Sequence, residues 1–255
     1  MNNTAVLLCK CKATCFDEDK NNKLYSFLEN CKIDLFELDD ICAYSLTNSE
    51  DFNSLDKRYA QKIVLACHAR AVKSLYLQNG VSWADFHVIN SRDNDIEASL
   101  HQLGQFKIEK GGAVTKKLIS NLEVPSWYPV IDTARCSSCG RCARFCLFGV
   151  YRFENGILQV QQPLNCKDKC PACARTCPES AIIFPKIAEG GIIAGAEPGK
   201  QNTGFSVVQG NLSSRLAERK MLRASILKPE IMQKAEQERF DALKKFGNLN
   251  TKKND

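Results

Sequence analysis

Two closely spaced runs of cysteines constrain this chain of 255 residues more than any other feature. The first run, Cys136–Cys146, has the pattern C-x2-C-x2-C-x3-C. The second, Cys166–Cys177, has the pattern C-x3-C-x2-C-x3-C-P and begins 30 residues after the first. Each run leads into a short apolar segment, so the two runs form an internal repeat. This repeat predicts a small pseudo-twofold domain organised around its eight thiols.

The spacing within the runs indicates iron–sulfur ligation. Three thiolates of a tight C-x2-C-x2-C loop reach one cubane, whereas the fourth cysteine leads the chain away and ligates the other cluster. We therefore expect two [4Fe–4S] clusters with interleaved ligands: Cys136, Cys139, Cys142 and Cys177 for the first, and Cys166, Cys170, Cys173 and Cys146 for the second. Zinc is the competing interpretation, but it favours two C-x2-C pairs separated by a longer gap. Two neighbouring clusters form an electron path that a purely structural role does not need.

The cysteine content also bears on the cellular compartment. The chain has 14 cysteines, which in an exported protein would indicate disulfides. We find no signal-peptide core, and no apolar run approaches the roughly 18 residues of a membrane helix. We therefore expect a cytoplasmic protein with reduced thiols and no membrane span.

Charge is distributed unevenly along the chain. Residues 1–110 hold 13 Lys and Arg against 16 Asp and Glu, whereas residues 111–255 hold 22 against 13. A basic half can indicate nucleic acid or an anionic membrane. Two oxidised clusters with their thiolates would each carry a charge of about −2, however, and would lower the net positive charge of this half. We therefore expect no nucleic-acid partner and instead a docking surface for an acidic protein.

The first 110 residues alternate short apolar runs with amphipathic stretches. This rhythm predicts an α/β domain with a mostly parallel sheet and helices on both faces. The expected strands are 4–8, 34–38, 63–66 and 85–90, and the expected helices are 20–30, 56–61, 70–79 and 95–103. Residues 113–122 fit either a helix or a strand.

The two cysteine runs resemble the bacterial-type two-cluster ferredoxin family over about 60 residues. The resemblance implies an α+β ferredoxin-type two-cluster domain over residues 127–186. A linker over 111–126 would precede it, and a loop and helical tail over 187–255 would follow it. The tail helices are expected at 213–227 and 229–246. Two departures from the family are the missing proline after Cys146 and the extra residue between Cys166 and Cys170.

Four further cysteines fall where a parallel sheet presents its ligands. Cys9 follows the first strand, with Cys11 two residues beyond it, Cys42 follows the second strand, and Cys67 ends the third. The carboxyl ends of such strands converge on one crevice. The four thiols are candidates for a third iron–sulfur cluster, for thiol–disulfide chemistry, or for ordinary core packing. For Cys15 and Cys31, packing or incidental exposure is the simpler interpretation.

A second resemblance involves the same four cysteines. The segments Val6-Leu-Leu-Cys9-Lys-Cys11, Asp40-Ile-Cys42 and Val64-Leu-Ala-Cys67-His-Ala-Arg70 resemble the amino-terminal domain of the iron–sulfur flavoprotein component of heterodisulfide reductase. This resemblance implies that Cys9, Cys11, Cys42 and Cys67 ligate an extra cluster. No G-x-G-x-x-G follows a strand, so we expect any flavin on a partner.

The sequence thus predicts an iron–sulfur electron-transfer protein or subunit of an oxidoreductase. It would pass single electrons through two [4Fe–4S] clusters to or from a redox centre in the amino-terminal domain. Its partners would be a redox protein such as a flavoprotein, or other oxidoreductase subunits. The alternative is a thiol/disulfide reductase of the heterodisulfide type that uses the amino-terminal cysteines.

Overall fold

The computed structural model describes most of the first 199 residues and a few residues near the carboxyl end. The described residues are 3–11, 17–83, 85–122 and 125–199, together with Gln233, Gln237, Glu238, Phe240, Asp241 and Lys244. The chain divides into two units, residues 1–202 and 203–255, which we treat separately. The predicted helix over 213–227 lies outside the described residues. The six described residues that fall in the predicted helix 229–246 are helical.

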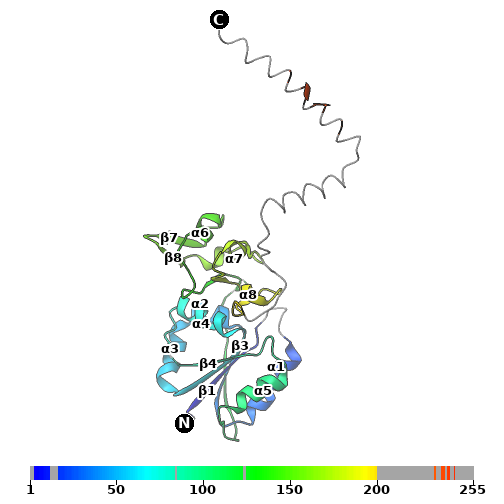
Figure 1. Cartoon of the computed structure of the whole chain (residues 1–255). Coiled ribbons are helices and arrows are strands. Elements are labelled where there is room, and N and C mark those ends of the chain that lie inside the picture. Colours follow the sequence, from blue (N-terminus) through cyan, green and yellow to red (C-terminus); the bar gives the residue numbers. More distant parts are fainter. Residues whose placement is uncertain are drawn as a thin grey trace. The chain divides into compact units, whose positions relative to one another are not determined.

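A five-stranded parallel sheet forms the centre of the first unit (Figure 1). Its strands are β1 (Thr4–Cys9), β2 (Asp34–Leu38), β3 (Gln61–Ala66), β4 (His87–Asn90) and β5 (Val114–Leu118). They lie in the order β4-β3-β1-β2-β5, and every neighbouring pair is parallel. The predicted α/β fold with a mostly parallel sheet is therefore confirmed.

Helices cover both faces of this sheet. On one face α1 (Glu18–Glu29) and α5 (Ile96–Gly104) pack side by side (Figure 1), whereas α2 (Ile41–Thr47), α3 (Ser49–Arg58) and α4 (Ala69–Gln78) cover the other. Successive side chains of a strand point to opposite faces of the sheet. Val6 therefore packs in the core under α1 and α5, and Leu7 packs in the core under α2, α3 and α4. Because both faces are buried, the central strands are continuously apolar.

Two elements of this domain differ from the sequence-based expectation. A short helix at 56–61 was expected, but α2 and α3 occupy most of residues 41–58 instead. The N-cap of α2 is Asp40, whose carboxylate accepts hydrogen bonds from the backbone N–H groups of Cys42 and Ala43. Most of α2 is buried, so it lacks the amphipathic period by which helices are recognised. The ambiguous segment 113–122 contains β5, an edge strand with mostly exposed side chains, inside the expected linker.

The cysteine-rich part, residues 125–199, follows the sheet in the chain. It contains the antiparallel pairs β6 (Val130–Ile131) with β9 (Ile182–Ile183) and β7 (Tyr151–Glu154) with β8 (Ile157–Val160), the helices α6 (Arg141–Phe145) and α7 (Ala172–Thr176), and the 3-10 turn η1 (Pro163–Asn165). Asn155-Gly156, a residue pair typical of tight hairpin turns, joins β7 to β8 with φ values of 51° and 76°. The repeat extends to the backbone, because Cys146 and Cys177 end their helices with the same φ of −75° and ψ of 116°.

Buried arginines from the sheet domain bind the cysteine-rich part. Arg70 of α4 donates from Nε to Asp132 at 2.6 Å, and Arg92 donates from Nη1 to the carbonyl of Pro185 at 2.7 Å. The short helix α8 (Gly191–Ala194), within a segment expected to be irregular, ends at Gly195 beside α4. A Cβ on Gly195 would lie 2.6 Å from Ala71 Cβ, so only glycine permits this close approach. These contacts join the two parts into one compact unit. Within the described residues, no helix has the length and apolar character needed to cross a bilayer.

Candidate iron–sulfur centres

The four cysteines of the first predicted ligand set line one small pocket: Cys136, Cys139, Cys142 and Cys177. Burial raises the pKa of the Cys142 thiol to about 11, and the neighbouring sulfurs of Cys136 and Cys177 add to that shift. At Cys139, which is exposed, the backbone N–H of Arg141 lowers the thiol pKa. The structure therefore gathers this set from both cysteine runs.

The second predicted set is also gathered from both runs. Burial, together with charge on Cys173, Cys170 and Cys146, raises the pKa of Cys166 to about 12. The Cys173 thiol has a pKa raised to about 11, again chiefly by burial. Because thiolates are the ligating form, filling either site would release protons. The Tyr151 hydroxyl donates a hydrogen bond of 3.1 Å to Cys173 Sγ.

The chemistry of these two donor sets fits iron–sulfur clusters. Each set presents four thiols and lies against an apolar core that contains Ile131 and Ile182. The sets adjoin each other, because Cys142 of the first set and Cys173 of the second belong to the same apolar core. In the described part of the chain, no three His, Cys, Asp or Glu side chains group as ligands of a single metal ion. A cubane spreads its four ligands over separate irons, so its thiols stand farther apart than those of one ion.

The four amino-terminal cysteines also come together, at the carboxyl ends of β1, β2 and β3. Cys9 ends β1, Cys42 lies in the first turn of α2, and Cys67 directly follows β3. All four, including Cys11, are between 1% and 7% exposed and belong to one core. A hydrogen bond with Cys11 raises the pKa of Cys9, and burial raises it further. Burial and the charge of Asp40 raise the pKa of Cys42.

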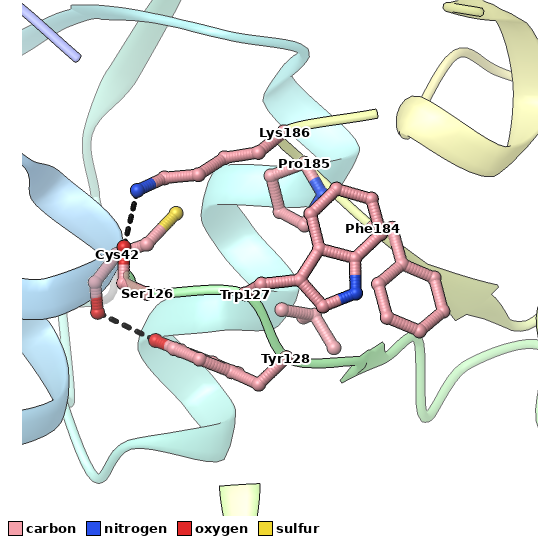
Figure 2. A pocket seen from close by; sticks show the side chains of 8 residues that line it. Cys42, Ser126, Trp127, Tyr128, Phe184, Pro185 and Lys186 are labelled. Atoms are coloured by element: carbon pink, nitrogen blue, oxygen red, sulfur yellow. Dashed lines mark hydrogen bonds between the residues drawn. The ribbon is translucent and has the colours of Figure 1, made fainter. Parts of the chain in front are cut away.

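A lysine from the cysteine-rich part reaches this thiol site (Figure 2). The ammonium of Lys186 contacts both the carboxylate of Asp40 and the hydroxyl of Ser126. Although burial opposes its charge, the neighbouring Cys42 and Asp40 raise the pKa of Lys186 above its ordinary value. Lys186 is therefore a partly buried cation beside Cys42. Sequence reasoning missed it, because 146 residues separate Lys186 from Asp40.

Aromatic side chains line the same junction. Figure 2 shows the Trp127 ring against Phe184, with centroids 5.2 Å apart, and the Tyr128 hydroxyl donating to the Cys42 carbonyl at 2.5 Å. These residues, with Cys42 and Lys186, line one shallow surface recess. Cys166 packs against both the core that holds the amino-terminal cysteines and the core that holds Cys142 and Cys173.

Among the described residues, one cysteine, Cys31, is separate from these three sets. Cys31 follows α1 and is buried in the core on the opposite face of the sheet, as expected for a packing residue. Cys15 lies outside the described residues.

Comparison with known proteins finds one informative similarity. A 61-residue part of the chain is 51% identical to an uncharacterised ferredoxin of Methanocaldococcus jannaschii. The match covers 24% of this chain and 42% of that ferredoxin, so the chain spans less than half the length of this relative. No protein-family model matches the chain, and no solved structure does.

Similarity and structure together bear on the class of protein. The similarity supports a ferredoxin-like iron–sulfur domain over part of the chain, and the structure shows an α/β domain built on a parallel sheet. Ferredoxin similarity supports a role in electron transfer.

Proposed function

We propose that this chain passes single electrons through two [4Fe–4S] clusters to or from a third iron–sulfur centre held by Cys9, Cys11, Cys42 and Cys67. It would do so as part of a larger cytoplasmic oxidoreductase system. The packing of Cys166 against both cores carries this proposal, since it brings the second cluster's ligand set beside the amino-terminal thiols. The resemblance to the flavoprotein component of heterodisulfide reductase supports the same assignment of the third centre.

The ligands of the two ferredoxin-type clusters follow the interleaved assignment made from spacing. Cys136, Cys139, Cys142 and Cys177 would hold the first, and Cys166, Cys170, Cys173 and Cys146 the second. Bound clusters supply one-electron redox chemistry. The chain's own contribution is to ligate, to exclude water through the surrounding apolar core, and to donate the Tyr151 hydrogen bond to Cys173.

Burial of the amino-terminal thiols supports ligation over thiol catalysis. Thiol nucleophiles act as thiolates in partly exposed sites with a lowered pKa. Here Cys9 and Cys42 are almost fully buried, and their pKa values are raised. Binding to iron would offset the free-energy cost of forming a buried thiolate, because the metal stabilises the thiolate. The observation that favours the alternative, a heterodisulfide-type reductase, is the hydrogen bond that pairs Cys9 with Cys11.

The partner would be an acidic redox protein, such as a flavoprotein or another oxidoreductase subunit. Next to Cys146 the chain exposes three large apolar side chains, Phe145, Leu147 and Phe148, of which Leu147 is 91% exposed. The basic residues Arg144, Lys167 and Lys169 lie in the same two cysteine runs and are exposed. An apolar centre with basic neighbours complements an acidic protein surface.

Anaerobic iron and sulfide analysis combined with EPR tests the proposed function. We expect about twelve irons per chain and three reducible centres. Replacement of Cys42 by alanine should remove about four irons and one EPR signal and leave the other two centres unchanged. The matched control is Cys31→Ala, another buried cysteine, which should keep all the iron.

Two outcomes would contradict the proposal in different ways. About eight irons, with the four amino-terminal thiols reacting with alkylating reagents, would favour the reductase. Colourless protein with zinc at the eight ferredoxin-type cysteines would overturn the electron-transfer role altogether.

A further inference from the structure

One buried hydroxyl lacks a hydrogen-bond partner. Tyr76, in α4, is 1% exposed, and among the described residues its hydroxyl finds no acceptor or donor. Its ring is held firmly, with centroids 5.0 Å from Phe52, 5.4 Å from Trp83 and 5.4 Å from Phe86. A small rotation of the ring therefore cannot bring the hydroxyl to another partner.

The other buried tyrosines show that this is an exception. Tyr44 donates to Asp51, Tyr59 donates to Asp34, and Tyr128 donates to the carbonyl of Cys42. Buried hydroxyl groups are normally hydrogen-bonded, because an unpaired one bears the full cost of desolvation. A phenylalanine would avoid that cost at position 76, so the hydroxyl needs an explanation.

The surroundings of Tyr76 indicate where its partner belongs. Tyr76 belongs to the same core as the four amino-terminal cysteines. Burial, followed by the charges of Cys9, Cys42 and Cys67, raises the pKa of its hydroxyl well above the ordinary value. The hydroxyl is thus within electrostatic reach of three sulfurs of the set but hydrogen-bonded to none of them. A sulfur-containing group held between these thiols would place further acceptors in that space.

We propose that the Tyr76 hydroxyl donates a hydrogen bond to a sulfur of the iron–sulfur centre held by Cys9, Cys11, Cys42 and Cys67, and thereby raises its reduction potential. This inference rests on the third centre of the proposed function. A hydrogen bond to sulfur stabilises the reduced, more negative state more than the oxidised state. Tyr151 and Cys173 provide the same arrangement in the cysteine-rich part. Tyr76 would therefore be a tuning residue rather than a ligand.

The test is an EPR-monitored redox titration of the whole, iron-loaded protein. The EPR signal of the proposed third centre is identified as the one that Cys42→Ala removes. In Tyr76→Phe we expect all the iron to remain and the equilibrium constant for reduction of this centre to fall up to tenfold, or about 59 mV for one electron. The other two centres should keep their potentials. The control is Tyr59→Phe, whose hydroxyl pairs with Asp34 near the opposite ends of the strands.

A second measurement covers the case in which Tyr76→Phe fails to fold. In wild-type chain made with 3-fluorotyrosine, the hydroxyl at position 76 is more acidic and a stronger hydrogen-bond donor. The reduction potential of the third centre should therefore rise. An unchanged potential in both experiments, with the third centre present, would overturn the hydrogen bond alone. Absence of the third centre, seen as about eight irons in the wild type, would overturn the proposed function and this inference together.

Discussion

The guanidinium of Arg70 donates a hydrogen bond of 2.6 Å from Nε to the carboxylate of Asp132, and both side chains are buried. Arg70 lies three residues after Cys67, and Asp132 lies four residues before Cys136. One ion pair thus connects the backbone around the amino-terminal thiols with the backbone that enters the first ferredoxin-type set. This contact holds the two thiol-bearing segments near each other, as electron transfer between the proposed centres would require.

Removal of Arg70 should destabilise the protein strongly. In Arg70→Met, Asp132 stays buried without its cation, and the Ala196 carbonyl loses a donor. We expect a loss of about 3–5 kcal/mol in the free energy of unfolding, measured by denaturant titration of the loaded protein. The control is Arg152→Met, because the Arg152–Glu154 pair is exposed and screened by solvent, so its loss should change stability far less. Equal losses in the two variants would contradict the role given to Arg70.

Substitution of Tyr151 should change one cluster potential and not the others. Tyr151→Phe removes the hydrogen bond to Cys173 Sγ, which is worth about 1 kcal/mol. The cluster assigned to Cys173 should therefore be harder to reduce by up to about tenfold, as read from a redox titration followed by EPR. A shift confined to the other cluster would refute the assignment of Cys173.

Gly140, between Cys139 and Cys142, should not tolerate a side chain. Its φ is +68°, and a Cβ would lie 2.7 Å from the Phe153 ring. In Gly140→Ala the backbone alone costs about 1–2 kcal/mol, and the overlap with Phe153 adds to it. We expect lower stability and incomplete loading of the first cluster, measured by thermal unfolding and iron analysis.

The matched substitution is Gly112→Ala. Gly112 has no atom within 4 Å of its Cβ position and no positive φ. The free energy of unfolding of the Gly112→Ala variant should stay within about 0.5 kcal/mol of the wild-type value. If both alanine variants behaved alike, the close approach at Gly140 would have no energetic role.

Loss of one ferredoxin-type ligand should remove one cluster. In Cys136→Ala we expect about four irons fewer and a less stable cysteine-rich part, because metal binding is linked to folding. Iron analysis and circular dichroism of anaerobically prepared protein measure the two effects. Full iron content with only a reduced soluble yield would show that Cys136 is not a ligand.

Local patterns in the sequence were sufficient for much of the fold. The strand at Ile63–Ala66 and the hairpin turn at Asn155-Gly156 could be predicted because their signals lie within a few residues. The interleaved assignment of eight cysteines to two clusters also comes from local spacing, which limits which thiols can share a cluster, and it stays a prediction. α2 escaped recognition because burial on nearly all sides removes the helical period.

The sequence by itself determined which residues are candidates for the chemistry: eight cysteines at spacings suited to iron–sulfur ligation, and four more at the carboxyl ends of predicted strands. Tertiary structure alone decided what surrounds them. Lys186 reaches Asp40 across 146 residues, and the Tyr76 hydroxyl is buried near thiols from three strand ends. The physical reason is that ligand spacing is a local property of the chain. Burial, charge and hydrogen bonding at a site arise only when distant segments pack together.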